Sequence, residues 1–392
     1  MTKKQTKSKT LLLSLTLGLF SFVYSAAQSN AISTKPFADG TNHWYHIKDK
    51  YNIINPAPNQ LVYDESDYAK IADNIIYFQR DNGGWPKNYD MKAILTPEQI
   101  KAVVETKSVL HTTFDNATTY THIYYLAQVY TLTKTEKYKE ACLKGIDFIL
   151  HAQYANGGWP QYFPLEKGEY STHITFNDGA YMGIMNLLKK VITDDPNFAF
   201  IDAKTKKKVT TSYQKGIDCI LKMQIKDQGK LTAWCQQHDE VTLLPAWARK
   251  FEPPSICNGE SADIVLFLMG IDKPNEQIIN AIQSAVKWFS DSQIYNTRVE
   301  TFKSTDFESA YKTKTVTEDR RVVIDLAAPP IWTRYYELNT ERPLFCDRDS
   351  KYLYSLAEVS RERRDGYTWY TYNPAKVLAK YPEWQKKWGL TK

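Results

Sequence analysis

The pentapeptide Asn-Gly-Gly-Trp-Pro occurs twice in the chain, at residues 82–86 and 156–160, so the two copies lie 74 residues apart. Each copy follows a run of apolar residues at helical spacing, and each is trailed by a short acidic string that opens another such run. Glycines end helices and permit sharp turns, and a tryptophan can fill such a turn against its neighbour. The repeat therefore predicts successive helical hairpins, and its long period favours an α/α toroid over a flat solenoid.

Helical periodicity recurs along most of the chain. The predicted helices cover residues 68–79, 117–132, 138–153, 180–191, 212–224, 258–268 and 275–294. Residues 28–66 are expected to form a loop-rich lead-in, whereas the valine-rich segment 320–325 is typical of a strand. A degenerate third copy of the repeat is expected at 224–234. We therefore predict one mostly α domain over residues 28–392, an α/α toroid (an incomplete α/α barrel) with a few short strands.

The first 27 residues have the features of a secretory signal. Four lysines precede the apolar run 11–23, and Ser25, Ala26 and Ala27 follow it. A basic start, a short apolar region and small residues before a cleavage site define such signals, and the apolar run is too short to span a bilayer permanently. We expect cleavage after Ala27 and a secreted protein, extracellular or periplasmic, that is not held in a membrane.

Composition narrows the classes of partner. The chain has 50 basic and 44 acidic residues, and without the four signal lysines the balance is 46 to 44. A nucleic-acid-binding protein would keep a strong basic excess, so that class is disfavoured. The five cysteines are scattered, and no His/Cys pair has the spacing of zinc ligands. The abundance of aromatic residues, with 27 tyrosines and 10 tryptophans, favours a carbohydrate ligand for an exported monomer.

Two acidic doublets follow the two copies of the repeat. Asp115-Asn116 and Asn177-Asp178 each precede a predicted helix, where Asp and Asn are common N-caps. A cap needs a single side chain, however, and two helices one repeat apart begin at the same end of a toroid. The doublets are therefore expected to converge on one cavity, where carboxylate and amide oxygens are suitable ligands for Ca²⁺.

Several cationic segments lie in the second half of the chain. They contain Arg249, the pair Arg320-Arg321, and Arg334. A guanidinium group binds a carboxylate through two hydrogen bonds, so arginines beside a calcium site would suit an acidic sugar. Each arginine taken singly is more often a surface or ion-pair residue.

Ordered motifs over about residues 50 to 375 resemble the family 10 polysaccharide lyases, which are pectate lyases with an α/α-toroid catalytic domain. The motifs are NGGWPKN, FDNATT, NGGWPQYFP, FNDGAY, AWCQQHD, PAWARKFEPPS, DRRVVIDLAAPPIWTRYYE, RPLFCDRD and RERRDGYTWY. The resemblance implies calcium-dependent β-elimination of polygalacturonate, the de-esterified form of pectin, to 4,5-unsaturated oligogalacturonides. It also implies that Asp115 and Asp178, with Asn116, hold the calcium ion. Gly179 stands where the family often has a further acid.

The same resemblance implies that Arg249 is the catalytic base and that Arg320 and Arg334 bind substrate carboxylates. An arginine base is unusual because a guanidinium group is essentially always protonated. Nearby positive charge from calcium and other arginines lowers its pKa, which is the direction that a base requires. The alternatives for the proton acceptor are a calcium-bound hydroxide and Tyr181.

Two further residues are candidates for substrate binding. Lys87 lies in the first Asn-Gly-Gly-Trp-Pro loop, where the second copy has Gln161 instead, which suggests a contact made by one copy only. His173 shortly precedes the second doublet. A solvated lysine and a histidine bonded to the backbone are the ordinary alternatives.

Three other functions are compatible with parts of the pattern. A glycoside hydrolase on a similar toroid would use Asp115 and Asp178 as its acid and base on an acidic polysaccharide. A terpene-cyclase-like toroid would account for Gln79 and Gln153 before the repeats, but not for the export signal. A non-catalytic pectin-binding protein would account for the aromatic residues and arginines, but not for the acidic doublets.

Overall fold

The structure is a computed structural model that describes residues 1–2, 31–49 and 52–390. Every helix and strand in these described ranges belongs to one compact unit, Ala31–Lys392. Beyond Met1 and Thr2, the predicted export signal lies outside the described residues. Among the helices that the structure describes, none is both long enough and apolar enough to cross a bilayer.

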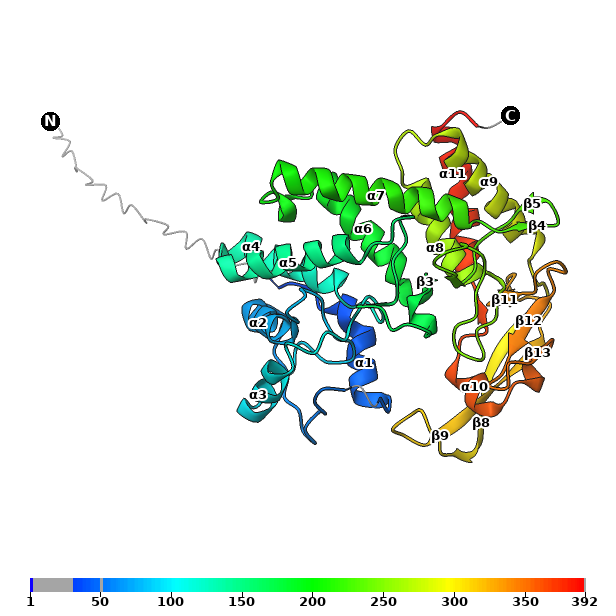
Figure 1. Ribbon diagram of the computed structural model, residues 1–392, viewed down its shortest axis with the longest axis horizontal. Helices are drawn as coiled ribbons and strands as arrows, with labels where there is room; N and C mark the ends of the chain where they lie inside the picture. Colours follow the sequence, from blue (N-terminus) through cyan, green and yellow to red (C-terminus); the bar gives the residue numbers. More distant parts are fainter. Residues whose placement is uncertain (3–30, 50–51, 391–392) are drawn as a thin grey trace. The chain divides into compact units, whose positions relative to one another are not determined.

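The helices that flank the repeated turns form two rows (Figure 1). One row consists of α2 (Tyr68–Phe78), α4 (Tyr120–Thr133), α6 (Ala180–Ile192) and α8 (Asn258–Met269). The other row consists of α5 (Glu136–Ala152), α7 (Ala203–Met223) and α9 (Glu276–Asp291). Each helix packs against its successor in the same row, and the pairs α4–α5, α6–α7 and α8–α9 join the rows. The fold is the predicted α/α toroid, with short strands at the helix ends.

One tryptophan and one glutamine hold each repeat to the next. The indole N–H groups of Trp85, Trp159 and Trp234 each donate to a carbonyl oxygen of the preceding helix, at 2.7, 2.9 and 2.8 Å. The amide of Gln153 donates to its own turn at Gly157 O and to Ser212 O of α7. Gln79 and Gln224 make the same pair of bonds in their repeats. The predicted third copy at 224–234 is therefore confirmed.

The first glycine of each turn is required by close packing. Gly83 and Gly157 have φ values of 91° and 101°, which L side chains rarely adopt. A Cβ on Gly83 would lie 2.4 Å from the carbonyl oxygen of Lys144 in α5, and one on Gly157 would lie 2.1 Å from that of Lys215 in α7. The turn backbone thus packs directly on the next helix.

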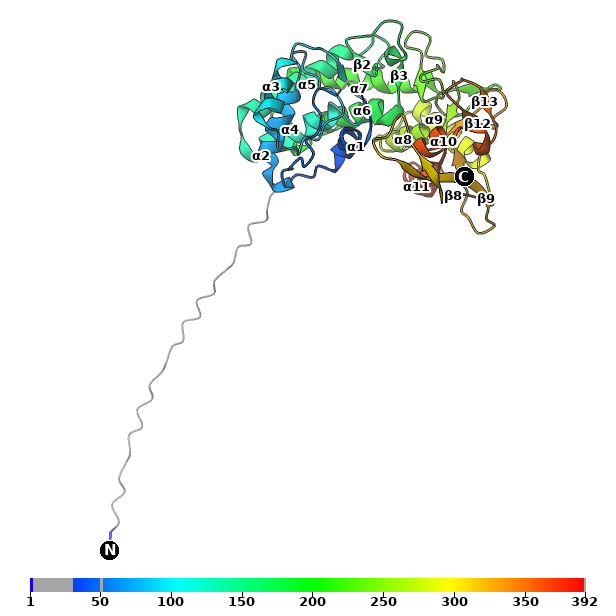
Figure 2. The same ribbon diagram turned by 90° about the horizontal axis from the view of Figure 1, so that it is seen from below.

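The strands are mostly two residues long and pair antiparallel. The two-stranded sheets pair β1 (Thr112–Thr113) with β2 (Tyr162–Phe163), β3 (Ile174–Thr175) with β6 (Gln237–His238), β4 (Lys226–Asp227) with β5 (Lys230–Leu231), β8 (Thr297–Phe307) with β9 (Val316–Ile324), and β10 (Trp332–Thr333) with β14 (Tyr370–Thr371). A four-stranded sheet has the order β13 (Tyr352–Leu353), β12 (Pro343–Cys346), β11 (Tyr335–Tyr336), β7 (Ile256–Cys257). Strand β9 includes residues 320–324 of the predicted strand 320–325, and the long β8–β9 hairpin reaches toward α1 (Figure 2).

Four helices were not predicted. They are α1 (Ala38–His46), α3 (Pro97–Glu105), α10 (Arg361–Gly366) and α11 (Asn373–Lys387). The expectation of a loop-rich lead-in is therefore wrong at α1, where buried Trp44 anchors the helix by donating to Ile54 O at 2.8 Å. Helix α7 also begins earlier than predicted, at Ala203 instead of residue 212, because the Asp202 side chain caps it by accepting from Thr205 N–H.

Candidate active site

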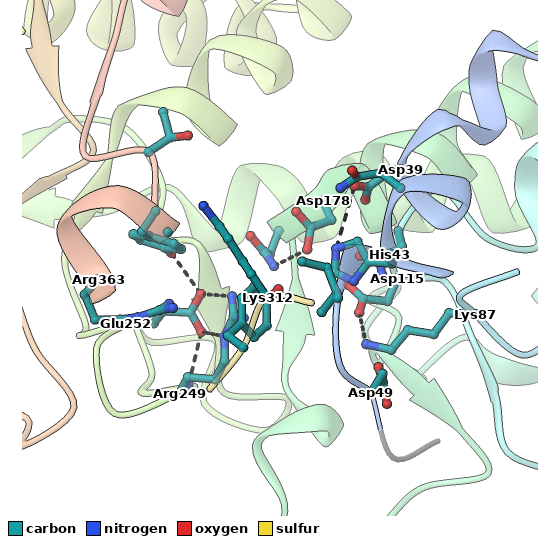
Figure 3. A pocket seen from close by; sticks show the side chains of 18 of the residues that line it. Asp39, His43, Asp49, Lys87, Asp115, Asp178, Arg249, Glu252, Lys312 and Arg363 are labelled. Atoms are coloured by element: carbon teal, nitrogen blue, oxygen red, sulfur yellow. Dashed lines mark hydrogen bonds and ion pairs between the residues drawn. The ribbon is translucent and has the colours of Figure 1, made fainter. Parts of the chain in front are cut away.

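A cavity of about 510 Å³ opens where the repeat turns meet α1, the β8–β9 hairpin and α10. Seven of the eight predicted site residues line it, namely Lys87, Asp115, Asn116, Asp178, Arg249, Arg320 and Arg334. The acidic groups Asp39, Asp115 and Asp178 lie on one side, and Arg249 and Arg363 lie on the other (Figure 3). Residues separated by more than two hundred positions are thus brought to one charged cavity.

The first doublet is held by a strand and a left-handed turn. Strand β1 pairs with β2, and the hydroxyl of Thr113 accepts from the Asp115 backbone N–H at 3.0 Å. The chain then turns with positive φ at Asn116, Ala117 and Thr119 before α4 begins at Tyr120. The N-cap interpretation of this doublet is therefore wrong, because Asp115 lies five residues before the helix and its side chain points into the cavity.

Asp115 is only 3% exposed. Its Oδ2 lies 2.9 Å from Lys87 Nζ, whereas Oδ1 accepts no hydrogen bond of ordinary geometry. Burial alone would raise the pKa of Asp115, but the charge and hydrogen bond of Lys87 outweigh burial and lower the pKa to about 2. The carboxylate is therefore charged at neutral pH, with one oxygen free to accept a further ligand.

The second doublet is built in the same way, with its two residue types exchanged. The hydroxyl of Thr175, in β3, accepts from the Asn177 backbone N–H at 3.1 Å, and the next residue, Asp178, has φ 49°. Asp178 faces the cavity, and its Oδ2 accepts from Asn177 Nδ2 at 2.6 Å. The Asp178 side chain is open to the cavity. Partial loss of hydration among the surrounding protein atoms, followed by the nearby charge of Asp115, raises the pKa of Asp178 above its ordinary value. The two carboxylates of this cavity therefore repel each other when both are ionised.

Helix α1 adds a third carboxylate, which the sequence analysis missed. Asp39 Oδ1 lies 3.8 Å from His43 Nε2, and both residues line the cavity. Burial and the charge of Asp115 raise the pKa of Asp39, although His43 opposes them. Burial also raises the pKa of the Tyr120 hydroxyl, and the charges of Asp178, Asp115 and Asp39 raise it further. The four-residue spacing of Asp39 and His43 was the available sequence signal.

On the opposite side, Arg249 is bound to a buried carboxylate. Its Nε donates to Glu252 Oε2 at 2.8 Å and its Nη2 donates to Oε1 at 2.6 Å. Burial would lower the pKa of Arg249, but the charge of Glu252 outweighs burial and raises it well above the ordinary value. Glu252 is 1% exposed and also accepts from Tyr367 and Gln236. The sequence analysis did not single out Glu252, three residues after Arg249.

Arg334 connects the cationic side to the second doublet. Its Nη2 donates to Glu260 at 2.6 Å and to Asn177 Oδ1 at 3.1 Å, and its guanidinium stacks 4.5 Å from the Tyr367 ring centroid. Arg320 donates to the backbone oxygen of Tyr367 at 3.2 Å. Hydrogen bonds therefore hold the guanidinium groups of both arginines in place at the cavity.

Of the two further candidates for substrate binding, Lys87 lines the cavity and His173 does not. Lys87 lines the cavity beside Asp115 and lies 5.7 Å from the Tyr162 ring centroid. His173 is not part of the lining, and its Nδ1 instead lies 2.8 Å from Glu240 Oε2. Within the described residues, the ligand atoms of His173, Asp239 and Glu240 form a compact group within 4.8 Å of one another, which Asp39, Asp115 and Asp178 do not.

The cavity can attract a polyanion and hold a cation at the same time, because opposite charges are fixed on its two sides. Tyr181, an alternative proton acceptor, is fully buried, and its hydroxyl donates to Gly216 O at 2.9 Å. It does not line the cavity. The five cysteines are free and buried, as expected for small core residues.

Comparison with known proteins is consistent with this chemistry. A family model for pectic acid lyases matches residues 79–378. Two similar solved structures are of a family 10 polysaccharide lyase from Cellvibrio cellulosa, one of them a mutant in complex with trigalacturonic acid. Both are 30% identical with a TM-score of 0.67, and they cover 80% and 82% of this chain and 92% and 93% of theirs. No curated protein matches the chain at a significant level.

Proposed function

The chain belongs to the pectic acid lyase family and is a polysaccharide lyase, and from that premise we propose that it cleaves polygalacturonate by calcium-dependent β-elimination. The observation that carries the proposal is that two carboxylates from successive repeats and arginines from the second half of the chain line one cavity. Family membership also favours a lyase over the glycoside hydrolase that would use Asp115 and Asp178 as acid and base. The products would be 4,5-unsaturated oligogalacturonides.

The residues present fit a calcium ion. Oδ1 of buried Asp115 accepts no hydrogen bond of ordinary geometry, so it can accept a cation. The charge of Asp115 adds to the loss of hydration that raises the pKa of Asp178, so the two carboxylates lie near enough to interact. Hard oxygen donors of this kind suit Ca²⁺. We propose that Asp115 and Asp178 hold the ion, with Asn116 beside them. When bound, calcium would neutralise a uronate carboxylate and so acidify the neighbouring C–H bond.

Substrate carboxylates would bind on the cationic side of the cavity. Arg320 and Arg334 supply guanidinium groups there, whereas Lys87 supplies an ammonium group on the acidic side, beside Asp115. In β-elimination, negative charge grows on the carboxylate next to C5, so fixed cations there stabilise the transition state more than the ground state. His173 lies outside this lining and is left out of the proposed binding set.

Arg249 is the proposed acceptor of the C5 proton. As the C5–H bond breaks, its electron pair forms the C4–C5 double bond, and the C4–O bond breaks toward the leaving sugar, whose oxygen takes up a proton. In the structure described, Glu252 keeps Arg249 cationic. Acceptance of a proton therefore requires that Arg249 loses this partner and that nearby positive charge lowers its pKa. Tyr181 is too deeply buried to take this role.

The deciding experiment follows the ultraviolet absorbance of the conjugated double bond in the unsaturated product. Purified protein is incubated with polygalacturonate, with calcium and then with an excess of chelator. The proposal expects absorbance to rise with calcium and to stop after chelation. Release of reducing ends without this absorbance would indicate hydrolysis, and binding without either signal would indicate a non-catalytic protein. Secretion of the monomer after cleavage at Ala27 is a separate proposal, tested by sequencing the N-terminus of the exported protein.

A further inference from the structure

The tip of the β8–β9 hairpin, residues 308–315, is joined to the chain that follows α1. The backbone N–H of Lys48 donates to Tyr311 O at 2.9 Å, and that of Thr313 donates to His46 O at 3.0 Å. Ile47 and Lys312 form an antiparallel bridge between these two bonds. Segments about 260 residues apart are therefore connected by a short piece of sheet.

The hairpin tip is also held from the opposite side. Lys312 Nζ lies 2.5 Å from the carboxylate of Asp365 in α10. Farther along the hairpin, Arg364 of α10 donates to both carboxylate oxygens of Asp319 in β9, at 2.8 and 2.6 Å. Because α10 and α1 lie on different sides of the cavity, the tip is fixed at both of its flanks.

The joined segments form part of the cavity wall. Ile47, Lys48, Tyr311 and Lys312 all line the cavity. In Figure 3, Lys312 lies between the side that carries Arg249 and the side that carries Asp115. The hairpin tip therefore lies between the cationic and acidic groups and is joined to both sides of the cavity. A polymer laid across these groups would meet the tip.

We propose that this protein acts on the ends of polygalacturonate chains, because the hairpin tip closes the cavity to internal segments. The inference rests on the proposed lyase function and deepens it. The cavity volume of about 510 Å³ is that of a pocket for a short ligand, for which ~300–1,000 Å³ is usual. The anchor after α1 lies outside residues 79–378, which the family model matches. One of the two segments joined at the tip therefore comes from the N-terminal part of this chain, before the matched residues.

The primary test compares viscosity with product formation. Unsaturated product and viscosity are followed together during cleavage of long polygalacturonate. An end-acting enzyme releases short unsaturated products from the start, while viscosity changes little over the first few per cent of bonds cleaved. A rapid early loss of viscosity would overturn the inference and leave the lyase function intact. Absence of unsaturated product from both polymer and short oligomers would instead refute the proposed function.

A disulfide variant tests whether the hairpin tip opens for the polymer. His46 and Thr313 face each other in the register next to the Ile47–Lys312 bridge, and neither lines the cavity. In the variant with both replaced by cysteine, a disulfide would hold the tip closed. We expect the oxidised and reduced forms to cleave polymer and trigalacturonate at similar rates. Loss of polymer cleavage alone on oxidation would show that the polymer enters through an opened tip, contrary to the proposal.

A shortened hairpin provides the converse test. Replacement of residues 309–314 by two glycines removes the bonds to α1 while leaving β8 and β9 in place. This variant is expected to lower viscosity several-fold faster per bond cleaved than the wild type. Circular dichroism and cleavage of trigalacturonate verify that it is folded and active. An unchanged ratio of viscosity loss to product in an active variant would overturn the role given to the tip.

Discussion

Asp178 occupies in the second repeat the position that Asn116 occupies in the first. Both residues have left-handed backbone conformations, with φ 49° and 50°, and both follow a residue whose N–H donates to a threonine of the preceding short strand. Asp115 consequently corresponds to Asn177. The carboxylate therefore stands at the first position of the doublet in the first repeat and at the second position in the second repeat.

This relationship predicts that the two acids contribute to one calcium site. Asp115→Asn and Asp178→Asn should each weaken calcium binding by at least about tenfold, since each removes a charged ligand. Isothermal titration of the free protein with calcium measures the effect without relying on activity, and excess calcium should partly restore cleavage. Asp272→Asn, on the exposed surface near Lys387, is the control. Wild-type affinity in both cavity variants would remove the calcium role.

Arg249→Lys should lower kcat for polygalacturonate by at least about 100-fold, because a lysine keeps the charge but cannot reproduce the geometry of the guanidinium group. The matched control is Arg321→Lys, on the exposed hairpin, where the arginine pairs with Glu300 at 2.9 Å. Initial rates of unsaturated product formation distinguish the two. Near-native turnover by Arg249→Lys would rule out Arg249 as the proton acceptor.

The turn glycines predict a graded loss of stability. Gly168→Ala should cost about 1–2 kcal/mol, because its φ is 84° but no atom lies within 4 Å of the added Cβ. Gly157→Ala should cost about 1–3 kcal/mol more, because its Cβ would also meet Lys215 O at 2.1 Å. Chemical denaturation of both variants measures the difference. Equal free energies of unfolding would mean that the turn does not depend on this close approach.

Buried His122 should contribute to the acid sensitivity of the fold. Burial lowers its pKa from 6.5 to about 3, so the folded state keeps the ring neutral while the unfolded state protonates it. The stabilisation is fully present above pH 6.5 and is lost as the pH falls from 6.5 toward 3. The difference in free energy of unfolding between the wild type and His122→Gln should shrink by about 2 kcal/mol between pH 8 and pH 5. Parallel stability curves would contradict this assignment.

The sequence predicted those parts of the fold that depend on local periodicity. The helices now seen as α2, α5, α6 and α9 were located within a few residues, because their apolar faces recur at helical spacing. The acidic doublets were also found, but their local conformation was misjudged. Asp and Asn are favoured both at N-caps and in left-handed turns, so residue type alone could not distinguish the two.

The cavity residues Asp39 and Glu252 were missed for a different reason. Asp39 lies on a short helix with few apolar positions, and Glu252 is distinguished only by the partners that converge on it. The bridge between residues 46–48 and 311–313 joins segments with no relationship in the sequence. Contacts at such separation depend on how the toroid brings its ends together, which no local pattern records.

The amino-acid sequence alone determined that this chain repeats a helical hairpin and carries two acidic doublets and several arginines in the order typical of one lyase family. These properties follow from residue types and spacing along the chain. The tertiary structure places Asp115 and Asp178 in one cavity, as their position in the repeat predicted. Only the tertiary structure decided that Glu252 keeps Arg249 charged and that a hairpin tip is joined to the end of α1 at the cavity. The reason is physical: pKa values and access depend on distances across the fold, and packing alone sets those distances.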